Sequence, residues 1–216
     1  MKDIAIYGAG GFGKEVVCLI DRINKSQSKP QWRLIGFFDD GKPIGTTISR
    51  YGAVLGGITE LNAWPKPLDI TIAIGTPTSI KKTVEAINNP LIGFPNVIDP
   101  IFVMADELTS EIGHGNIIQR NCFISCDVKL GNFNVLNGDV VFGHDAIVQD
   151  YNVFMPNVHI SGGVTIGNEN LFGVGSFVIQ GLKIGNLIRL SPGSMLLTKP
   201  KDNNTYLGNP AKLLKF

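Results

Sequence analysis

Residues 142–172 read FGHDAIVQDYNVFMPNVHISGGVTIGNENLF, and a large apolar residue stands at every sixth position, beginning with Phe142. The same register runs without a slip from Ile112 to Leu196. With 44% apolar residues in the chain, fifteen independent positions would all be apolar by chance only about five times in a million, so the repeat is genuine. The fifteen positions are Ile112, Ile118, Ile124, Leu130, Leu136, Phe142, Val148, Phe154, Ile160, Ile166, Phe172, Val178, Ile184, Leu190 and Leu196.

A period of six fits neither an α-helix nor a simple alternating strand, but it is typical of short strands joined by tight turns in a parallel β-helix. Glycine often follows the apolar position, as at Gly143 and Gly167, and small or amide residues recur three places after that. Three hexads make one triangular coil, so residues eighteen apart stack about 4.7–4.9 Å from coil to coil. Phe154 should therefore lie beside Phe172, and the fifteen hexads should make five coils.

Composition narrows the class of protein. The chain has 216 residues and a formal net charge of +1, without the basic excess typical of nucleic-acid binding. No apolar run approaches a membrane span, and the first residues lack the pattern of a signal peptide, so a cytoplasmic protein is expected. The three cysteines form no CxxC pair, which favours reduced thiols, and Cys122 should pack as a small hydrophobe.

The first twenty residues carry a second pattern. Residues 2–7 indicate a buried strand, which leads into the glycine-rich loop 8–13, and residues 14–20 then indicate a helix. Glycines allow the backbone to approach a ligand, and the helix N-terminus offers free N–H groups and a favourable dipole. This order is typical of a βα unit that binds a phosphate group.

Two further strands, 34–38 and 70–74, precede Asp39-Asp40 and Gly75, and a helix is expected over 79–87. Because open α/β sheets bind ligands at the carboxyl ends of their strands, these loops should converge on one site. We therefore predict a small Rossmann-like parallel sheet of three or four strands over residues 1–95. A parallel β-helix with a C-terminal tail should follow over 96–216.

The glycine loop leaves three interpretations open. A nicotinamide dinucleotide is one, but the domain is small for two mononucleotide halves, and Asp39 and Asp40 lie further downstream than the usual acidic residue at about twenty. Half of such a site could hold a single nucleotide with its diphosphate. In the third interpretation the glycines make a tight turn and nothing more.

The hexads also carry residues that the architecture does not require. His144 and Asp145 follow Gly143, and a histidine beside a carboxylate is the usual general base with its orienting partner. The eighteen-residue spacing stacks Asp127 beneath Asp145 and places Gly162-Gly163 one coil above the pair. We also expect Asn137 near the same edge. Alternatively, His144 is a solvated turn residue.

A zinc site needs several convergent ligands. The other two histidines, His114 and His159, fall at different places around the eighteen-residue turn and are expected to be structural. Convergence of all three would require another subunit, so no metal cofactor is expected.

The sequence resembles the two-domain bacterial sugar acetyltransferases of the left-handed β-helix class, which act on sialic acids or on nucleotide-linked amino sugars. The resemblance covers nearly the whole chain. It rests on the hexads together with the segments 6–13, 36–40, 72–75, 143–145, 161–167 and 208–212.

This resemblance implies a left-handed helix and a homotrimer with active sites between adjacent prisms. The acceptor's nucleotide and diphosphate would lie at Gly8, Gly10, Gly11, Phe12 and Gly13, with Asp39, Asp40 and Gly75 about the base and ribose. The co-substrate acetyl-CoA would pass Gly162, Val174, Gly193 and Ser194 toward Pro210 and Lys212. His144 would be the catalytic base, Asp145 would orient it, Asn137 would contact the sugar, and a backbone N–H near Gly162 would stabilise the oxyanion.

Three positions depart from the family pattern. Some members have His in place of Phe12, some have Glu in place of Asp145, and some carry a second histidine near the position of Val153. These departures concern the phosphate contact, the orientation of the catalytic histidine and the contacts to CoA.

The resemblance implies an acetyl-CoA-dependent N-acetyltransferase that acts on the amine of a nucleotide-linked amino (dideoxy) sugar, in surface polysaccharide biosynthesis. O-acetylation of a sugar hydroxyl, as in the sialic acid enzymes, is the closest alternative. A non-catalytic prism that binds nucleotide sugars and a nicotinamide enzyme are alternatives of other classes.

Overall fold

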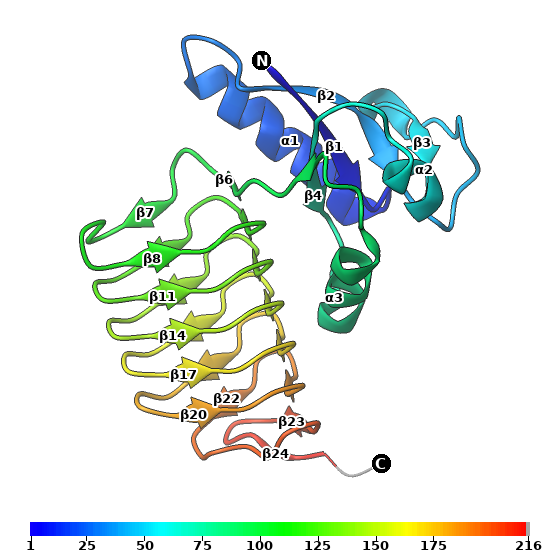
Figure 1. The fold of residues 1–216 in the computed structure, drawn as a ribbon. Helices are drawn as coiled ribbons and strands as arrows, with labels where there is room; N and C mark the ends of the chain where they lie inside the picture. Colours follow the sequence, from blue (N-terminus) through cyan, green and yellow to red (C-terminus); the bar gives the residue numbers. More distant parts are fainter. Residues whose placement is uncertain (215–216) are drawn as a thin grey trace.

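A small parallel sheet with helices packed around it forms the first part of the molecule (Figure 1). The computed structural model describes residues 1–214. The strands of this sheet are β1 (Lys2–Tyr7), β2 (Trp32–Phe38), β3 (Val54–Gly56), β4 (Leu68–Ile72) and β5 (Ile92–Gly93). The helices are α1 (Gly11–Ser26), the 3-10 helix η1 (Ser49–Tyr51), α2 (Ile58–Asn62) and α3 (Pro77–Ala86).

The sheet order is β3-β2-β1-β4-β5, and every pairing in it is parallel. The predicted Rossmann-like arrangement is confirmed, but the sheet has five strands where three or four were expected. The two additional strands, β3 and β5, are three and two residues long, too short to show a hydrophobic pattern. Helix α1 begins at Gly11, three residues earlier than predicted, because the glycine loop itself forms its first turn.

The second part is a triangular prism of stacked coils, as the hexads predict (Figure 1). Its first face comprises β6 (Val97–Ile98), β9 (Ile117–Ile118), β12 (Val135–Leu136), β15 (Val153–Phe154), β18 (Leu171–Phe172), β21 (Arg189–Leu190), β23 (Thr205–Leu207) and β24 (Lys212–Leu213). Its second face comprises β7 (Val103–Met104), β10 (Phe123–Ile124), β13 (Val141–Phe142), β16 (His159–Ile160), β19 (Phe177–Val178) and β22 (Met195–Leu196). Its third face comprises β8 (Glu111–Ile112), β11 (Lys129–Leu130), β14 (Ile147–Val148), β17 (Thr165–Ile166) and β20 (Lys183–Ile184).

Each of the fifteen repeat positions is the second residue of a two-residue strand, and its side chain points into the prism. Phe154 pairs with Phe172, eighteen residues away, as predicted. The prism extends beyond the repeat: β6 and β7 already pair with the coil above, and β23 continues the first face. Residues 215–216, the end of the predicted second domain, lie outside the described residues.

Phenylalanine rings fill the centre of the prism. Phe154 is fully buried, its ring stacks on Phe172 with centroids 4.8 Å apart, and Phe142 meets it edge-on at 4.9 Å. We expect Phe154→Ala to lower the free energy of unfolding by about 3–5 kcal/mol, because close-packed coils cannot collapse into the space that the ring leaves. Urea denaturation of the variant and the wild type measures this loss. A loss below about 1 kcal/mol would contradict the packing described here.

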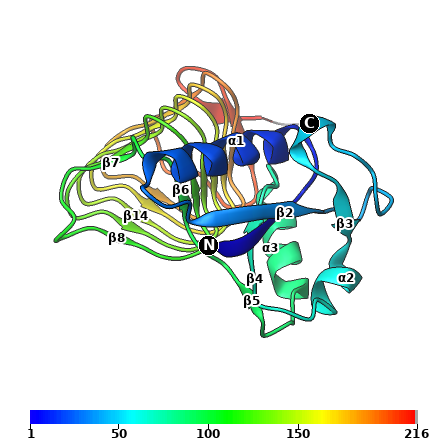
Figure 2. The same cartoon turned by 90° about the horizontal axis from the view of Figure 1, so that it is seen from above.

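The α/β domain packs against the first face of the prism, with α1 lying across the N-terminal end of the prism (Figure 2). Val135 and Val153, which point outward from this face, share a hydrophobic cluster with Ile72 and Ile80. Two ion pairs join the domains: Arg22 Nη2 lies 3.1 Å from Asp99 Oδ1, and Lys81 Nζ lies 2.7 Å from Glu169 Oε1.

The three edges of the prism differ in what covers them. The edge between the third and first faces, here the covered edge, holds Phe133, Tyr151 and Glu169, which contact the α/β domain. The edge between the first and second faces, here the open edge, carries the turns that follow β9, β12, β15 and β18. The edge between the second and third faces, here the histidine edge, lies opposite the first face and carries His144.

Candidate active site

His144 and Asp145 form a hydrogen-bonded pair on the histidine edge. His144 Nδ1 lies 2.7 Å from Asp145 Oδ2. Asp145 has a φ of 57°, a left-handed conformation that Asp tolerates, and the turn directs its carboxylate back toward the ring. Because a carboxylate only accepts hydrogen bonds, Nδ1 carries a proton, and in the neutral imidazole Nε2 then keeps its lone pair. The imidazole is half exposed, so Nε2 is accessible to a substrate.

The coils above and below complete this edge as the spacing predicts. A Cβ on Gly162 would lie 2.5 Å from His144 Nε2, so only glycine leaves room for the ring. Gly163 N–H donates to His144 O at 2.7 Å, and Asp145 N–H donates to Cys126 O at 3.1 Å. Asp127 therefore lies one coil below Asp145, and both have a φ of 57°.

Asn137 lies on a different edge from His144, so the expectation that it lies near the same edge is wrong. Seven residues carry the chain along β13 from one corner of the triangle to the next. Asn137 is buried on the open edge, where its Nδ2 donates to Phe154 O at 3.2 Å and lies 3.6 Å from Met155 Sδ. Within one chain it cannot contact a substrate held at His144.

The glycine loop lies at the carboxyl end of β1, and its glycines have two roles. Gly8 has a φ of +111°, and a Cβ there would lie 2.6 Å from Ala73 O. A Cβ on Gly13 would lie 2.1 Å from Gly8 O, so these two residues allow close packing of strand, loop and helix. Gly10 and Gly11 face open space and have no side chain to cap α1, which leaves the helix N-terminus accessible. An anion fits there.

The two aspartates lie beside this loop, as predicted, and both are tied to backbone N–H groups. Asp39 Oδ2 accepts from Ala9 N–H at 2.8 Å, and Asp40 Oδ1 accepts from Ile58 N–H at 2.8 Å. Tyr7 donates its hydroxyl proton to Asp40 Oδ2. Burial and this carboxylate raise the pKa of Tyr7 above its ordinary value, which keeps the phenol protonated as a donor. Asp39 therefore shapes the loop, whereas Asp40 ties the end of β1 to the start of α2, and both carboxylates keep lone pairs for a ligand.

Of the other two residues expected at the nucleotide, Phe12 is partly buried and Gly75 is exposed. The Phe12 side chain packs against both hydrophobic clusters of the α/β domain. Gly75 is exposed beyond the end of β4 and has no atom near its Cβ position. It borders a largely apolar cavity of about 380 Å³ that also reaches Val174 and Arg189.

The residues expected at acetyl-CoA fall into two groups in one chain. Gly162 lies on the histidine edge, whereas Val174, Gly193 and Ser194 lie on the open edge. Val174 is 44% exposed, and the Ser194 hydroxyl is buried and accepts from Gly208 N–H at 2.9 Å. Pro210 and Lys212 are exposed in the tail, which is held to the second face because Ala211 N–H donates to Met195 O.

A second cavity, the α1 cavity, lies between α1 and the open edge and has a volume of about 400 Å³. One atom in its lining, Gln119 Nε2, is buried and has no hydrogen-bond partner within residues 1–214. The lining residues are Glu15, Cys18, Leu19, Arg22, Asp99, Gln119, Arg120, Asn137, Gly138 and Pro156. The sequence pattern missed this cavity and the Tyr7 contact, because each brings together elements far apart in the chain.

The remaining histidines and cysteines lie apart from these residues. His114 packs edge-on to Phe133 at the covered edge, and His159 stacks on Phe177 on the second face. Within residues 1–214, no three His, Cys, Asp or Glu side chains are grouped so that they could hold a metal ion. The cysteines are free, and burial raises the pKa of the Cys122 thiol to about 12. None of the described helices has the length and apolar character needed to span a bilayer.

Comparison with known proteins covers both parts of the chain. Residues 3–87 match the family model described as the PglD N-terminal domain. No curated protein matches the sequence of this chain.

Solved structures match over the whole length. The acetyltransferase domain of PglB from Neisseria gonorrhoeae FA1090, in complex with acetyl coenzyme A, is 25% identical with a TM-score of 0.85, over 99% of each chain. WeeI from Acinetobacter baumannii AYE is 26% identical with a TM-score of 0.70, over 99% of this chain and 100% of that chain. A mutant of perosamine N-acetyltransferase from Caulobacter crescentus, in complex with CoA and GDP-perosamine, is 20% identical with a TM-score of 0.83, over 100% and 98%.

The two-domain fold and these matches agree with one another. The solved structures at 25% and 26% identity confirm the resemblance to hexapeptide-repeat sugar acetyltransferases, and with it the acyltransferase class of the enzyme.

Proposed function

We propose that this protein transfers the acetyl group of acetyl-CoA to the amine of a nucleotide-linked amino sugar, with His144 as the general base. The observation that carries the proposal is the His144–Asp145 pair, whose accessible Nε2 lies beneath Gly162. The relatives support the co-substrate, since one was solved with acetyl coenzyme A and another with CoA and GDP-perosamine.

The placement of the pair supports an active site between two chains. The α/β domain packs on the first face, and the histidine edge is the edge opposite that face. The glycine loop of one chain therefore cannot deliver a sugar to His144 of the same chain. Because the covered edge is closed by the chain's own domain, the open edge remains for a neighbour's histidine edge. Closed rotational symmetry with this one contact repeated gives a ring, and we propose the homotrimer.

In this trimer, the expected acetyl-CoA residues on the histidine edge of one chain come together with those on the open edge of the next. Gly162 of one chain would meet Val174, Gly193 and Ser194 of the next, so that acetyl-CoA lies in the groove between them. Asn137, on the open edge, would face His144 of the neighbour. The acceptor's diphosphate would bind at the N-terminus of α1, over Gly10 and Gly11, with Asp39, Asp40 and Gly75 about the nucleoside.

The chemistry then needs few groups. His144 Nε2 takes a proton from the sugar amine as the nitrogen attacks the thioester carbonyl, and Asp145 stabilises the imidazolium that forms. Gly162 N–H donates to no partner within residues 1–214, and it would stabilise the oxyanion. The C–S bond then breaks, CoA leaves as its thiolate, and the proton held by His144 neutralises it.

The choice of an amine over a hydroxyl rests on the relative that is a perosamine N-acetyltransferase, solved with GDP-perosamine. A neutral amine needs only proton removal during attack, whereas a sugar hydroxyl needs stronger activation. The His144–Asp145 pair would take that proton. O-acetylation remains the outcome to test against it.

Thiol release from acetyl-CoA tests this function, with a panel of nucleotide-linked amino sugars, free amino sugars and sialic acid as acceptors. We expect turnover on a nucleotide-linked amino sugar and little on the free sugar, since the α/β domain binds the nucleotide. Turnover confined to free sialic acid would instead establish O-acetylation. Failure to bind acetyl-CoA would exclude the acetyltransferase altogether.

A further inference from the structure

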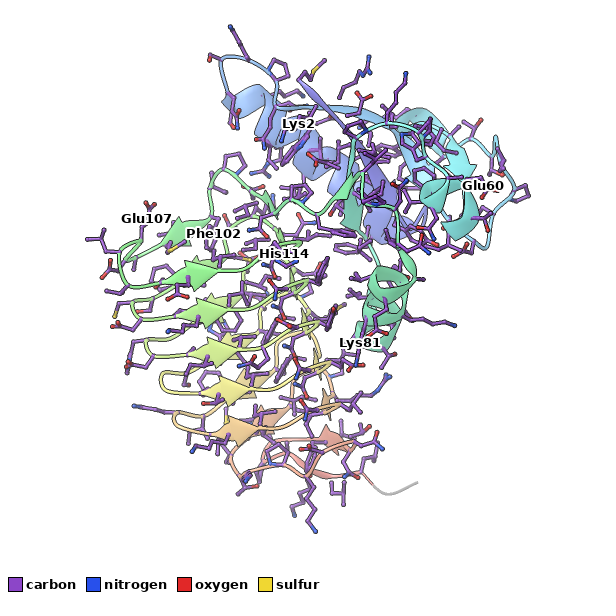
Figure 3. All side chains as sticks on the ribbon, in the orientation of Figure 1. Lys2, Glu60, Lys81, Phe102, Glu107 and His114 are labelled. Carbon is purple, nitrogen blue, oxygen red and sulfur yellow. The ribbon has the colours of Figure 1, made fainter. Side chains whose placement is uncertain are left out.

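One loop of the prism breaks the six-residue period. Eight residues separate Met104 from Ile112, where the repeat has six, so the loop 105–110 bulges from the histidine edge. Leu108 at its tip is 97% exposed, the most exposed of the large hydrophobic side chains in the described residues. Figure 3 shows the neighbouring Glu107 pointing away from the prism, on the side remote from the α/β domain.

The loop and the α1 cavity lie at matching levels of the prism. The loop follows β7 in the first coil, and Asp99 of the cavity follows β6 in that same coil. In the second coil, Asp127 on the histidine edge corresponds to Arg120 on the open edge. A threefold axis along the prism rotates one copy onto the next without translation, so each residue stays at its own level.

The two surfaces are also complementary in charge. Arg120 is exposed at the cavity and belongs to no ion pair in residues 1–214, and the same holds for Asp127 on the opposite edge. Opposite charges that meet across an interface fix its register and suppress wrong pairings. Leu108 supplies an apolar group for the part of the cavity wall where Cys18 is exposed on α1.

We propose that the loop 105–110 of one chain closes the α1 cavity of the next, with Leu108 against α1 and Asp127 opposite Arg120. The inference rests on the proposed function, because it takes the homotrimer from there. The loop fills the end of the cavity near Asp99 and leaves the end near Asn137 for the acceptor sugar. It thereby sets the size of acceptor that the site admits.

Cysteine cross-linking tests the contact without any measurement of turnover. Leu108→Cys would be made in a Cys126→Ser background. The native Cys18 is then the one other accessible thiol, because Cys122 is buried. A short bismaleimide should then give covalent dimers and trimers. The matched variant with Cys18→Ser should give none. A trimer in light scattering that does not cross-link, or cross-links that persist with Cys18→Ser, would overturn the contact.

Charge reversal gives an independent test. Arg120→Asp and Asp127→Arg should each raise the protein concentration at which the trimer dissociates by about tenfold, and the double variant should restore it. A long side chain is tolerated at Asp127, since Glu169 and Leu187 adopt the same left-handed conformation. Asp202→Arg, at the far end of the prism, should have no effect.

Failure of the double variant to restore the trimer would overturn the pairing. A monomeric wild type would overturn both the contact and the trimer. A chain that cross-links as expected but transfers acetyl to no acceptor would keep the contact and reject the proposed function.

Discussion

His144→Ala should lower the rate of thiol release by about 10²–10⁴-fold while leaving the melting temperature nearly unchanged. The loss follows from removal of the general base, whose contribution is typically of this size. The fold should tolerate the change because the imidazole is half exposed and, within residues 1–214, its side chain bonds only to Asp145. Steady-state kinetics and thermal unfolding measure the two effects together.

His159→Ala is the matched control for this variant. His159 is also an exposed histidine on the prism, one coil further along, where it stacks on Phe177. Its removal should change turnover by less than about threefold, since its ring stacks on Phe177 and points from the second face, not from the histidine edge. Equal losses in both variants would mean that the assay reports damage to the prism and no specific role of His144.

Gly162→Ala should lower kcat by about 10²-fold, through displacement of a single side chain. The added Cβ would lie 2.5 Å from His144 Nε2, so the imidazole must swing outward. Since the ring is half exposed, it can move at little cost in stability, but a shift of about 1 Å in a catalytic group costs roughly 10²-fold in rate. Kinetics with acceptor and acetyl-CoA varied separately would show the fall in kcat.

Ser161→Ala, one residue away on the same turn, should keep wild-type turnover and so separates this effect from general disturbance of the edge. Gly162→Ala with an unchanged kcat would contradict the place of Nε2 in the reaction. A large loss of thermal stability would contradict the freedom assigned to the imidazole.

The hexad period predicted the prism closely because its register is set locally, six residues at a time. Each repeat position faces inward, and eighteen-residue spacing correctly stacked Phe154 beside Phe172 and Gly162 above His144. The period could not show which corner each turn occupies relative to the α/β domain. Asn137 was expected near His144, although the period itself places residues seven apart on neighbouring corners.

The α/β domain was predicted in outline from its glycine loop and its three longest strands. The two shortest strands were missed, because two or three residues carry no hydrophobic period. The α1 cavity and the Tyr7 bond to Asp40 depend on contacts between segments 33 or more residues apart, which no local pattern encodes. The sequence therefore predicts which residues could carry the chemistry, but not how all of them are arranged in space.

Mixed trimers test most directly the claim that the active site is shared between chains. His144→Ala retains the glycine loop, and Gly11→Asp, which places a carboxylate where the diphosphate would bind, retains His144. Each homotrimer alone should be inactive. Unfolded and refolded together in equal amounts, they should recover roughly a quarter of wild-type turnover, because one interface in four then combines an intact His144 with an intact loop on the next chain. A mixture that forms mixed trimers and stays inactive would contradict the shared site.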